Sequence, residues 1–257
     1  MEYLLICIAA LIGSGLTLFS GFGLGTLLGP VFGLFFPIEL AIVLTAIVHF
    51  LNNLFKLVLL GRNANRNIVF RFGIPAILFS FLGAYLLSHL NTMHPIWSYT
   101  IQNHSFQIMP IKLIIGCVLL FFSLFEIIPK LANLQFDKKY LSLGGVLSGF
   151  FGGLSGNQGA LRSAFLIRTQ LSPKEFIATG VVIACLIDTS RLVVYSNQIM
   201  QHYQNINFIL LSLATLSAFL GAYLGNKIIK KITVNSIQKF VAVMLILFAI
   251  LLLLGII

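Results

Sequence analysis

Residues 144–166 read GGVLSGFFGGLSGNQGALRSAFL and differ sharply from the rest of a strongly hydrophobic chain. Seven of these 23 residues are glycine. Glycine costs about 1 kcal/mol relative to alanine inside a helix, so the cluster predicts that a helix breaks here. A break within a membrane leaves backbone N–H and C=O groups without partners. Such backbone is tolerated only where protein covers it or where it lines a cavity.

A weaker copy of this pattern lies near the N-terminus, where Gly13-Ser14-Gly15 is followed by Gly21-Phe22-Gly23-Leu24-Gly25. Two broken helices in corresponding halves of a hydrophobic chain are the best sequence indication of a transporter's binding site. The two clusters therefore predict a single site to which both halves contribute.

The composition predicts an all-α, polytopic integral membrane protein. Of 257 residues, 59% are hydrophobic and only 9% are charged, against about 25% charged in soluble domains. The apolar runs are long and continuous, unlike the short alternating strands of a membrane β-barrel. The net charge of +10 fits basic cytoplasmic loops facing anionic lipid better than nucleic-acid binding. The N-terminal MEYLLICIAAL reads as a first transmembrane helix and not as a cleaved signal.

Ten apolar segments are expected to be helices: 3–20, 25–36, 38–60, 68–90, 109–128, 141–155, 159–170, 174–196, 207–228 and 237–257. Segments 25–36 and 159–170 are short. At 1.5 Å per residue, about 12 residues rise only about 18 Å, too little to cross a core of about 30 Å. We therefore expect two broken half-helices, completed by extended glycine-rich chain, among about 8–10 transmembrane helices.

The chain also contains an internal duplication. Residues 81–86, FLGAYL, recur as residues 219–224, and Pro37-Ile38-Glu39 recurs as Pro173-Lys174-Glu175. The two offsets, 138 and 136, agree closely, as expected for a repeat. The predicted organisation is a first transmembrane repeat over 1–129, a basic cytoplasmic linker over 130–140, and a second repeat over 141–257.

Loop charge predicts the topology. Basic residues mark loops at 62–71, 130–139, 168–174 and 227–239, whereas 91–108 and 197–206 contain no Lys or Arg. The positive-inside rule places the basic loops in the cytoplasm. All four are expected there together only if both short segments cross the membrane, since re-entrant segments would leave the 227–239 loop outside. Each repeat then has five crossings, so the second repeat is inverted relative to the first and both termini lie outside.

The glycine clusters themselves predict an anion site. A half-helix that begins in mid-membrane exposes free N–H groups and the positive end of its dipole, so it can bind an anion without a lysine. The predicted substrate-binding residues at the breaks are Gly23, Gly25 and Thr26 in the first repeat and Asn157, Gln158 and Gly159 in the second. The alternative interpretation is close helix packing through small residues, which we favour for Gly145, Gly149 and Gly153.

Polar residues within segment 38–60 share one helical face. His49, Asn52, Asn53 and Lys56 fall at spacings of three, four and seven residues. Asn52 and Asn53 are predicted to contact substrate, and His49 and Lys56 to act in ion coupling or a polar relay. The alternatives are that Lys56 extends to the membrane surface and that His49 is a hydrogen-bonded core histidine.

Segment 174–196 carries a second ionisable pair. Asp188 and Arg191 are three residues apart and can pair on a helix. Ionisable groups inside a membrane are costly and indicate function, so both are assigned to the same relay, with a coupling proton on Asp188 or His49. The alternative is a purely structural ion pair. Arg162, three residues after Gly159, is expected to lie inside the membrane and to contact the anion.

Enzyme chemistry has little support in the sequence. The chain has six acidic residues in all, with no Ser–His–Asp arrangement and no P-loop. The histidines at 89, 94 and 104 are irregularly spaced and lack nearby carboxylates, so we expect no metal and no cofactor. The three cysteines are scattered in apolar segments and are expected to be small core residues.

The order of these motifs resembles a known family. GFGLGTLLGP at 21–30, a proline-bounded helix with Asn52-Asn53 and Lys56, and GGVLSGFFGGLSG at 144–156 resemble the TauE/SafE sulfite exporter family, also called the 4-toluene sulfonate uptake permease family. The resemblance covers nearly the whole chain. It implies a plasma-membrane carrier for sulfite, sulfonates or related organic anions, usually with about eight crossings. The family's second cluster commonly runs into a proline. Here it reads Gly156-Asn157-Gln158-Gly159, which puts the substrate in doubt more than the fold.

We therefore predict a secondary transporter, an exporter or permease, for a small anion bound between the two breaks and moved by alternating access. Its expected partners are the anion and the lipid bilayer of a bacterial inner or plasma membrane, with proton coupling and a monomeric or homodimeric state. The alternatives are a non-transporting membrane subunit and a lipid-processing membrane protein. A non-transporting subunit would not need matched polar faces in both repeats. A lipid-processing protein would need a nucleophile or metal cluster facing a lipid-accessible groove, and the sequence shows none.

Overall fold

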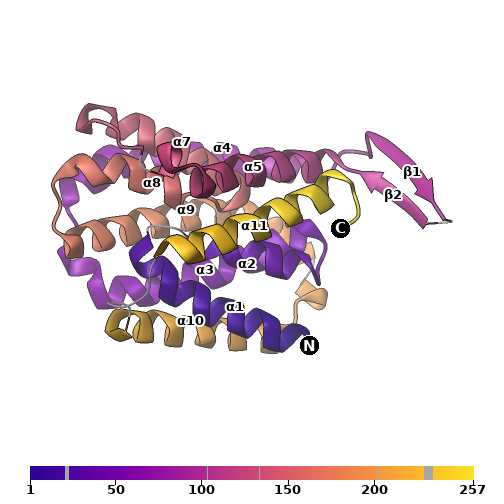
Figure 1. Cartoon of the computed structure of the whole chain (residues 1–257), viewed down its shortest axis with the longest axis horizontal. Helices are drawn as coiled ribbons and strands as arrows, with labels where there is room; N and C mark the ends of the chain where they lie inside the picture. The colour runs from indigo at the N-terminus through magenta and orange to yellow at the C-terminus, as the bar shows by residue number, and fades with distance from the viewer. Residues whose placement is uncertain (21–22, 103, 133, 202, 229–233) are drawn as a thin grey trace.

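The structure, a computed structural model, describes residues 1–257 except 21–22, 103, 133, 202 and 229–233 (Figure 1). Its main helices are α1 (Glu2–Ser20), α2 (Leu24–Gly33), α3 (Ile38–Leu60), α4 (Arg66–Asn91), α5 (Pro110–Ile127), α7 (Leu141–Ser155), α8 (Gly159–Leu166), α9 (Pro173–Gln201), α10 (Phe208–Ile228) and α11 (Val234–Leu253). Each of the ten expected segments therefore corresponds to one helix. Short turns of helix lie between them: η1 (Gly61–Asn63), α6 (Pro129–Ala132), η2 (Lys138–Tyr140), η3 (Ile167–Thr169) and η4 (Tyr203–Asn205).

The chain is an all-α multi-pass membrane protein. Among the described residues, four helical segments are long and apolar enough to cross a membrane: Ile38–Asn63, Arg66–Asn91, Pro173–Gln201 and Phe208–Gly225. Shorter apolar helices accompany them, including Leu24–Gly33. Large apolar side chains such as Leu78, Leu216 and Leu247 point outward and are 63%, 60% and 59% exposed. Such side chains suit a surface covered by lipid.

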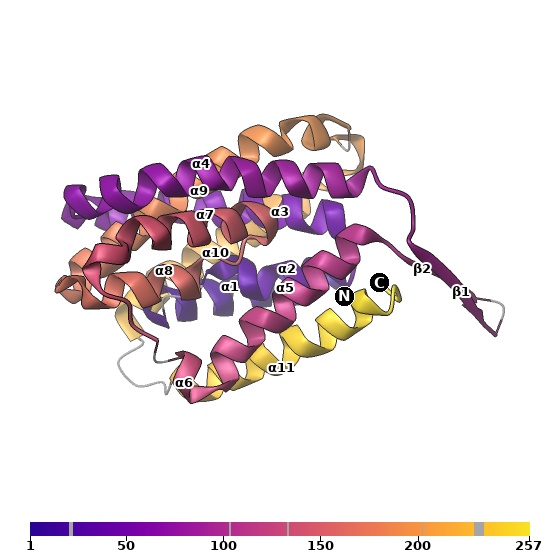
Figure 2. The same ribbon diagram turned by 90° about the horizontal axis from the view of Figure 1, so that it is seen from above.

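One element was not expected. Strands β1 (Trp97–Ile101) and β2 (His104–Ile108) form an antiparallel hairpin in the lysine-free loop, pairing Trp97 with Ile108. The hairpin projects beyond the helix ends (Figures 1 and 2). Alternation of apolar and polar residues in Trp97-Ser98-Tyr99-Thr100-Ile101 was the available signal, because successive side chains in a strand point to opposite faces.

Glycine contacts fix the main helix pairs. Helix α7 packs along α4, and a Cβ added at Gly145, Gly149 or Gly153 would lie 2.2, 2.2 or 2.1 Å from a carbonyl oxygen of α4. The packing interpretation of these three glycines therefore holds. Helix α1 packs along α10 in the same manner, with a Cβ on Gly221 placed 2.0 Å from the Leu11 carbonyl oxygen.

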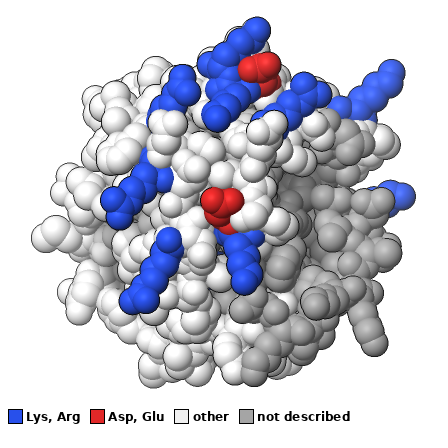
Figure 3. Space-filling view, turned by 90° about the vertical axis from the view of Figure 1, so that its left-hand side faces the viewer, with Lys and Arg blue, Asp and Glu red and all other residues white. Residues whose placement is uncertain are grey.

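Helices of the second half run opposite to their counterparts in the first half. Helix α3 and helix α9 run in opposite directions, as do α5 and α11, and both termini lie at one end of the molecule (Figures 1 and 2). Lys and Arg gather at the other end, which we call the basic end (Figure 3). This arrangement is the one expected for inverted repeats. The boundaries of the two repeats remain a prediction.

Whether the two short segments cross the membrane stays a prediction, and the contacts of α7 and α8 show how they are paired. Helix α7 enters from the basic end, and α8 returns to it. Phe136, before α7, stacks on Phe165 of α8 at 4.2 Å and donates its N–H to the Ala164 carbonyl oxygen at 3.0 Å. The two helices thus form a hairpin with both ends on one side. Loop polarity is unaffected, because a hairpin and two crossings return the chain to the same side.

Candidate functional site

The two glycine breaks meet inside the molecule. Helix α7 ends at Gly156, which has φ +81°, a left-handed conformation that favours glycine. The Gly156 carbonyl oxygen lies 3.4 Å from the position of a Cβ on Gly25 and 3.9 Å from one on Gly23, the residue before α2. Gly21 and Phe22 of the first cluster lie outside the described residues. The start of α2 thus contacts the turn between α7 and α8.

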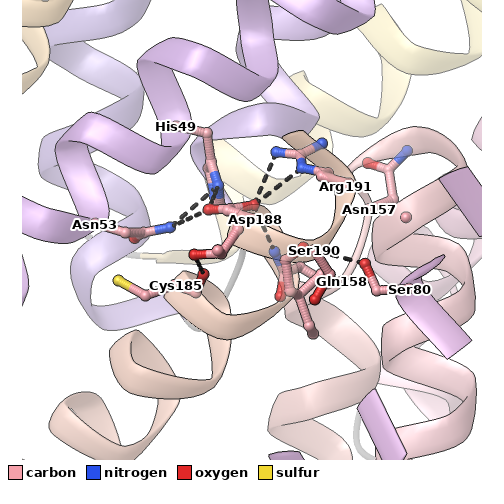
Figure 4. A network of polar contacts seen from close by, with 12 residues as sticks. His49, Asn53, Ser80, Asn157, Gln158, Cys185, Asp188, Ser190 and Arg191 are labelled. Atoms are coloured by element: carbon pink, nitrogen blue, oxygen red, sulfur yellow. Dashed lines mark hydrogen bonds and ion pairs between the residues drawn. The ribbon is translucent and has the colours of Figure 1, made fainter. Parts of the chain in front are cut away.

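Asp188 of α9 is the centre of a buried polar cluster (Figure 4). Its Oδ2 lies 2.7 Å from His49 Nδ1 and accepts a hydrogen bond from Asn53 Nδ2 at 2.9 Å. Its Oδ1 accepts from Arg191 Nε at 3.0 Å and from Gln158 Nε2 at 3.2 Å. The carboxylate therefore joins α3, the α7–α8 turn and α9. Both oxygens are satisfied, as a buried charge requires.

A pocket lies between this cluster and the basic end, with about 480 Å³ of empty space that includes the part open to solvent. Helices α1, α2, α3, α8 and α9 contribute its walls. The polar wall comprises Thr17, His49, Asn53, Lys56, Arg162 and Ser163, beside the backbone of Gly23. Apolar residues Leu24, Leu166, Phe176, Ile177 and Val181, with Gly180, form the rest. Phe176 and Ile177 are half-buried in the first turns of α9, so the pocket runs from the basic end to the centre.

The buried charges around the pocket do not balance. Lys56, Arg162 and Arg191 are buried cations, and Asp188 is the buried carboxylate of the described residues. Asp188 pairs with Arg191, whose Nη2 lies 2.9 Å from Oδ1. Within the described part of the chain, neither Lys56 nor Arg162 has a carboxylate within ion-pair distance.

Neutral oxygens hold these two cations in place. Arg162 Nη1 donates to Gln158 Oε1 at 3.1 Å. Lys56 Nζ lies 3.5 Å from the Ser14 carbonyl oxygen and, with the Asn52 amide turned to satisfy its neighbours, 3.2 Å from its oxygen. Lys56 is only 4% exposed, so it does not extend to the membrane surface. Two uncompensated positive charges therefore face one pocket.

The structure brings together part of the predicted site. Gly23, His49, Asn53, Lys56 and Arg162 line the pocket. Asp188, Arg191 and Gln158 lie behind it and hold its polar wall. The remaining predicted residues are buried but do not line the pocket: Gly25, Thr26, Asn52, Asn157 and Gly159. Asn52 faces α1, where Ser14 Oγ lies 3.0 Å from its amide.

Several lining residues were missed. Gly180 packs against Arg162, because a Cβ there would lie 3.4 Å from the Arg162 Nε. Nothing in its local sequence distinguishes Gly180 from other helical glycines. Thr17 lies two residues after Gly15 of the first glycine cluster, and Ser163 lies one residue after Arg162. Their closeness in sequence to these predicted residues was the available signal. Phe176 and Ile177 read as ordinary membrane-facing residues.

The comparison with known families agrees with this architecture. Residues 5–252 match the family described as sulfite exporter TauE/SafE. The match covers nearly the whole chain, and the chain therefore belongs to that family of membrane transporters. Neither the curated proteins nor the solved structures contain a significant match to it.

Proposed function

We propose that this chain is a secondary transporter that carries a small anion, such as sulfite, a sulfonate or a related organic anion, through the pocket beside Lys56 and Arg162. The observation that carries the proposal is the pair of buried cations, 4% and 8% exposed, that face one pocket with no carboxylate of the described residues within ion-pair distance. Burying an uncompensated charge is costly unless a counter-ion shares the site. A bound anion supplies that counter-ion.

Backbone groups of α2 add to the anion's ligands. Gly23 and Leu24 line the pocket at the N-terminus of α2, where first-turn N–H groups lack helical partners and the helix dipole is positive. The first repeat therefore contributes its half-helix directly. Gly159, at the start of α8, does not line the pocket, so α8 contributes through Arg162.

The position of the pocket supports alternating access as the transport mechanism. In this conformation the pocket reaches the basic end, which we assign to the cytoplasm of a bacterial inner or plasma membrane by the positive-inside rule. Rocking one repeat against the other would close that end and open the end that carries the termini. This role requires no catalytic group, so we place the protein among carriers and not among enzymes.

The test is binding and flux with purified protein. A thermal-shift screen against sulfite, sulfate, thiosulfate, methanesulfonate and acetate should reveal an anion that raises the melting temperature, because a ligand that binds the native state stabilises it. In proteoliposomes, Arg162→Ala should abolish flux of that anion while the protein still folds. Arg168→Ala is the matched control, since Arg168 is exposed and its Nε bonds Gln135. Unchanged flux in Arg162→Ala would exclude Arg162 from the site.

A further inference from the structure

The two ring nitrogens of His49 face different surroundings. Nδ1 lies 2.7 Å from Asp188 Oδ2, behind the pocket. Nε2 lies 3.2 Å from the position of a Cβ on Gly23, and both residues line the pocket. His49 thus connects the carboxylate of the buried cluster with the proposed anion site.

Asp188 determines which nitrogen of His49 carries the hydrogen. Its two oxygens accept from Asn53, Gln158 and Arg191, all of which present N–H groups to it. A carboxylate surrounded by donors stays ionised and accepts from the imidazole as well. Asn53 Nδ2, 3.1 Å from His49 Nδ1, is also a donor and cannot accept that hydrogen. Neutral His49 is therefore protonated at Nδ1 and presents the lone pair of Nε2 to the pocket.

A lone pair in the pocket repels an anion, whereas a protonated Nε2 donates a hydrogen bond to it. In the empty pocket, burial and the neighbouring cations oppose a positive charge on His49; these cations are Lys56 on α3, Arg162 on α8 and Arg191 on α9. The Asp188 carboxylate, 2.7 Å from Nδ1, favours that charge, and the thiol of Cys185 lies on α9 one turn before Asp188. An arriving anion compensates the cations and accepts from Nε2, so anion and proton stabilise each other's binding.

We propose that His49, and not Asp188, takes up the coupling proton, one for each anion bound, so that the two cross the membrane together. This proposal rests on the proposed anion carriage. Asp188 is unsuited to the role because Asn53, Gln158 and Arg191 all donate to its oxygens and favour the ionised carboxylate. Asp188 instead acts as the positioning residue that orients His49 and, through Gln158, Arg162.

The experiment counts protons during anion binding. Binding of sulfite and of sulfate is measured by titration calorimetry in two buffers of different ionisation enthalpy, from about pH 6 to pH 8.5, the range in which histidine titrates. Near the upper limit the wild type should take up about one proton more per anion than His49→Gln at the same pH. The anion's own titration is common to both proteins and cancels. Affinity should fall up to about tenfold per pH unit in the wild type relative to the variant.

Two controls separate the outcomes. His89→Gln alters an exposed histidine at the end of α4 and should keep the wild-type proton count. Equal proton counts in the wild type and His49→Gln, with the anion still bound, would overturn His49 as the proton carrier and leave anion transport standing. Failure of both anions to bind the wild type would overturn the proposed function and this inference together. Loss of the extra proton in His49→Gln with binding retained supports both.

Discussion

The two halves of the molecule share a backbone plan but differ in chemistry. With the offset of 136 residues, the second-repeat residues Arg162, Asp188 and Arg191 correspond to Thr26, Asn52 and Phe55. In the other direction, His49 and Lys56 correspond to Cys185 and Leu192. Helix contacts are shared, since α7 packs on α4 as α1 packs on α10. The charged groups are not shared: each half supplies a different part of one polar site.

The same comparison explains where the pocket lies. Phe176 and Gly180 line it at the basic end. Their counterparts, Leu40 and Leu44, are 7% and 2% exposed and pack with Leu28 in an apolar cluster of the opposite half. In the proposed transport cycle these two positions would exchange their packing, and the end that carries the termini would then open.

The largest effect is expected at Asp188, whose counterpart in the first half is the uncharged Asn52. Asp188→Asn should remove the buried charge that Arg191 and His49 depend on and leave Arg191 uncompensated, at a cost of about 3–5 kcal/mol. The melting temperature of the detergent-solubilised protein should fall severely. The corresponding change in the first half, Asn52→Asp, adds a carboxylate near Lys56 and should be far better tolerated. Similar losses in both variants would mean that the halves are chemically equivalent here.

Lys56 tests the balance between stability and binding. Lys56→Met keeps the packing of the stem and removes a buried charge that lacks a carboxylate partner. The melting temperature without anion should rise or stay constant, while anion affinity falls about 10- to 100-fold, the value of a charged hydrogen bond. Its counterpart Leu192→Met should change neither. A loss of stability without loss of affinity would assign Lys56 a structural role.

Most of the fold was predictable because each helix leaves a clear signal in the sequence. The ten main helices follow apolar runs, two of them short, and Gly144–Leu166 marked the α7–α8 break within one residue. Loop charge gave the basic end correctly. It could not show that α7 and α8 form a hairpin, because a hairpin and a pair of crossings leave the loops on the same sides.

The site was predictable only in part, for a physical reason. His49, Asn53 and Lys56 share a helical face, and helical periodicity is readable from one sequence. The contacts of Asp188 with Gln158 and His49 join residues 30 and 139 positions apart, which depend on tertiary packing. Gly180 and Phe176 enter the pocket only because α8 folds back against α9. Periodicity within one helix contains no information about that contact.

Glycine substitutions provide the smallest test, and they address the part of the comparison that is symmetric. Gly83 and Gly221 are counterparts, and a Cβ added to either would lie 2.1 or 2.0 Å from a carbonyl oxygen of the facing helix. Gly83→Ala and Gly221→Ala should therefore destabilise the protein by similar amounts, about 1–3 kcal/mol, measured as a lower melting temperature. Gly29→Ala is the control, because its nearest neighbour would be 3.9 Å away and alanine favours a helix by about 0.5–1 kcal/mol. Its melting temperature should rise. A large fall in melting temperature for only one of the two variants would show that the two helix interfaces are not equivalent. The structure would then not support an exchange of packing between equivalent halves.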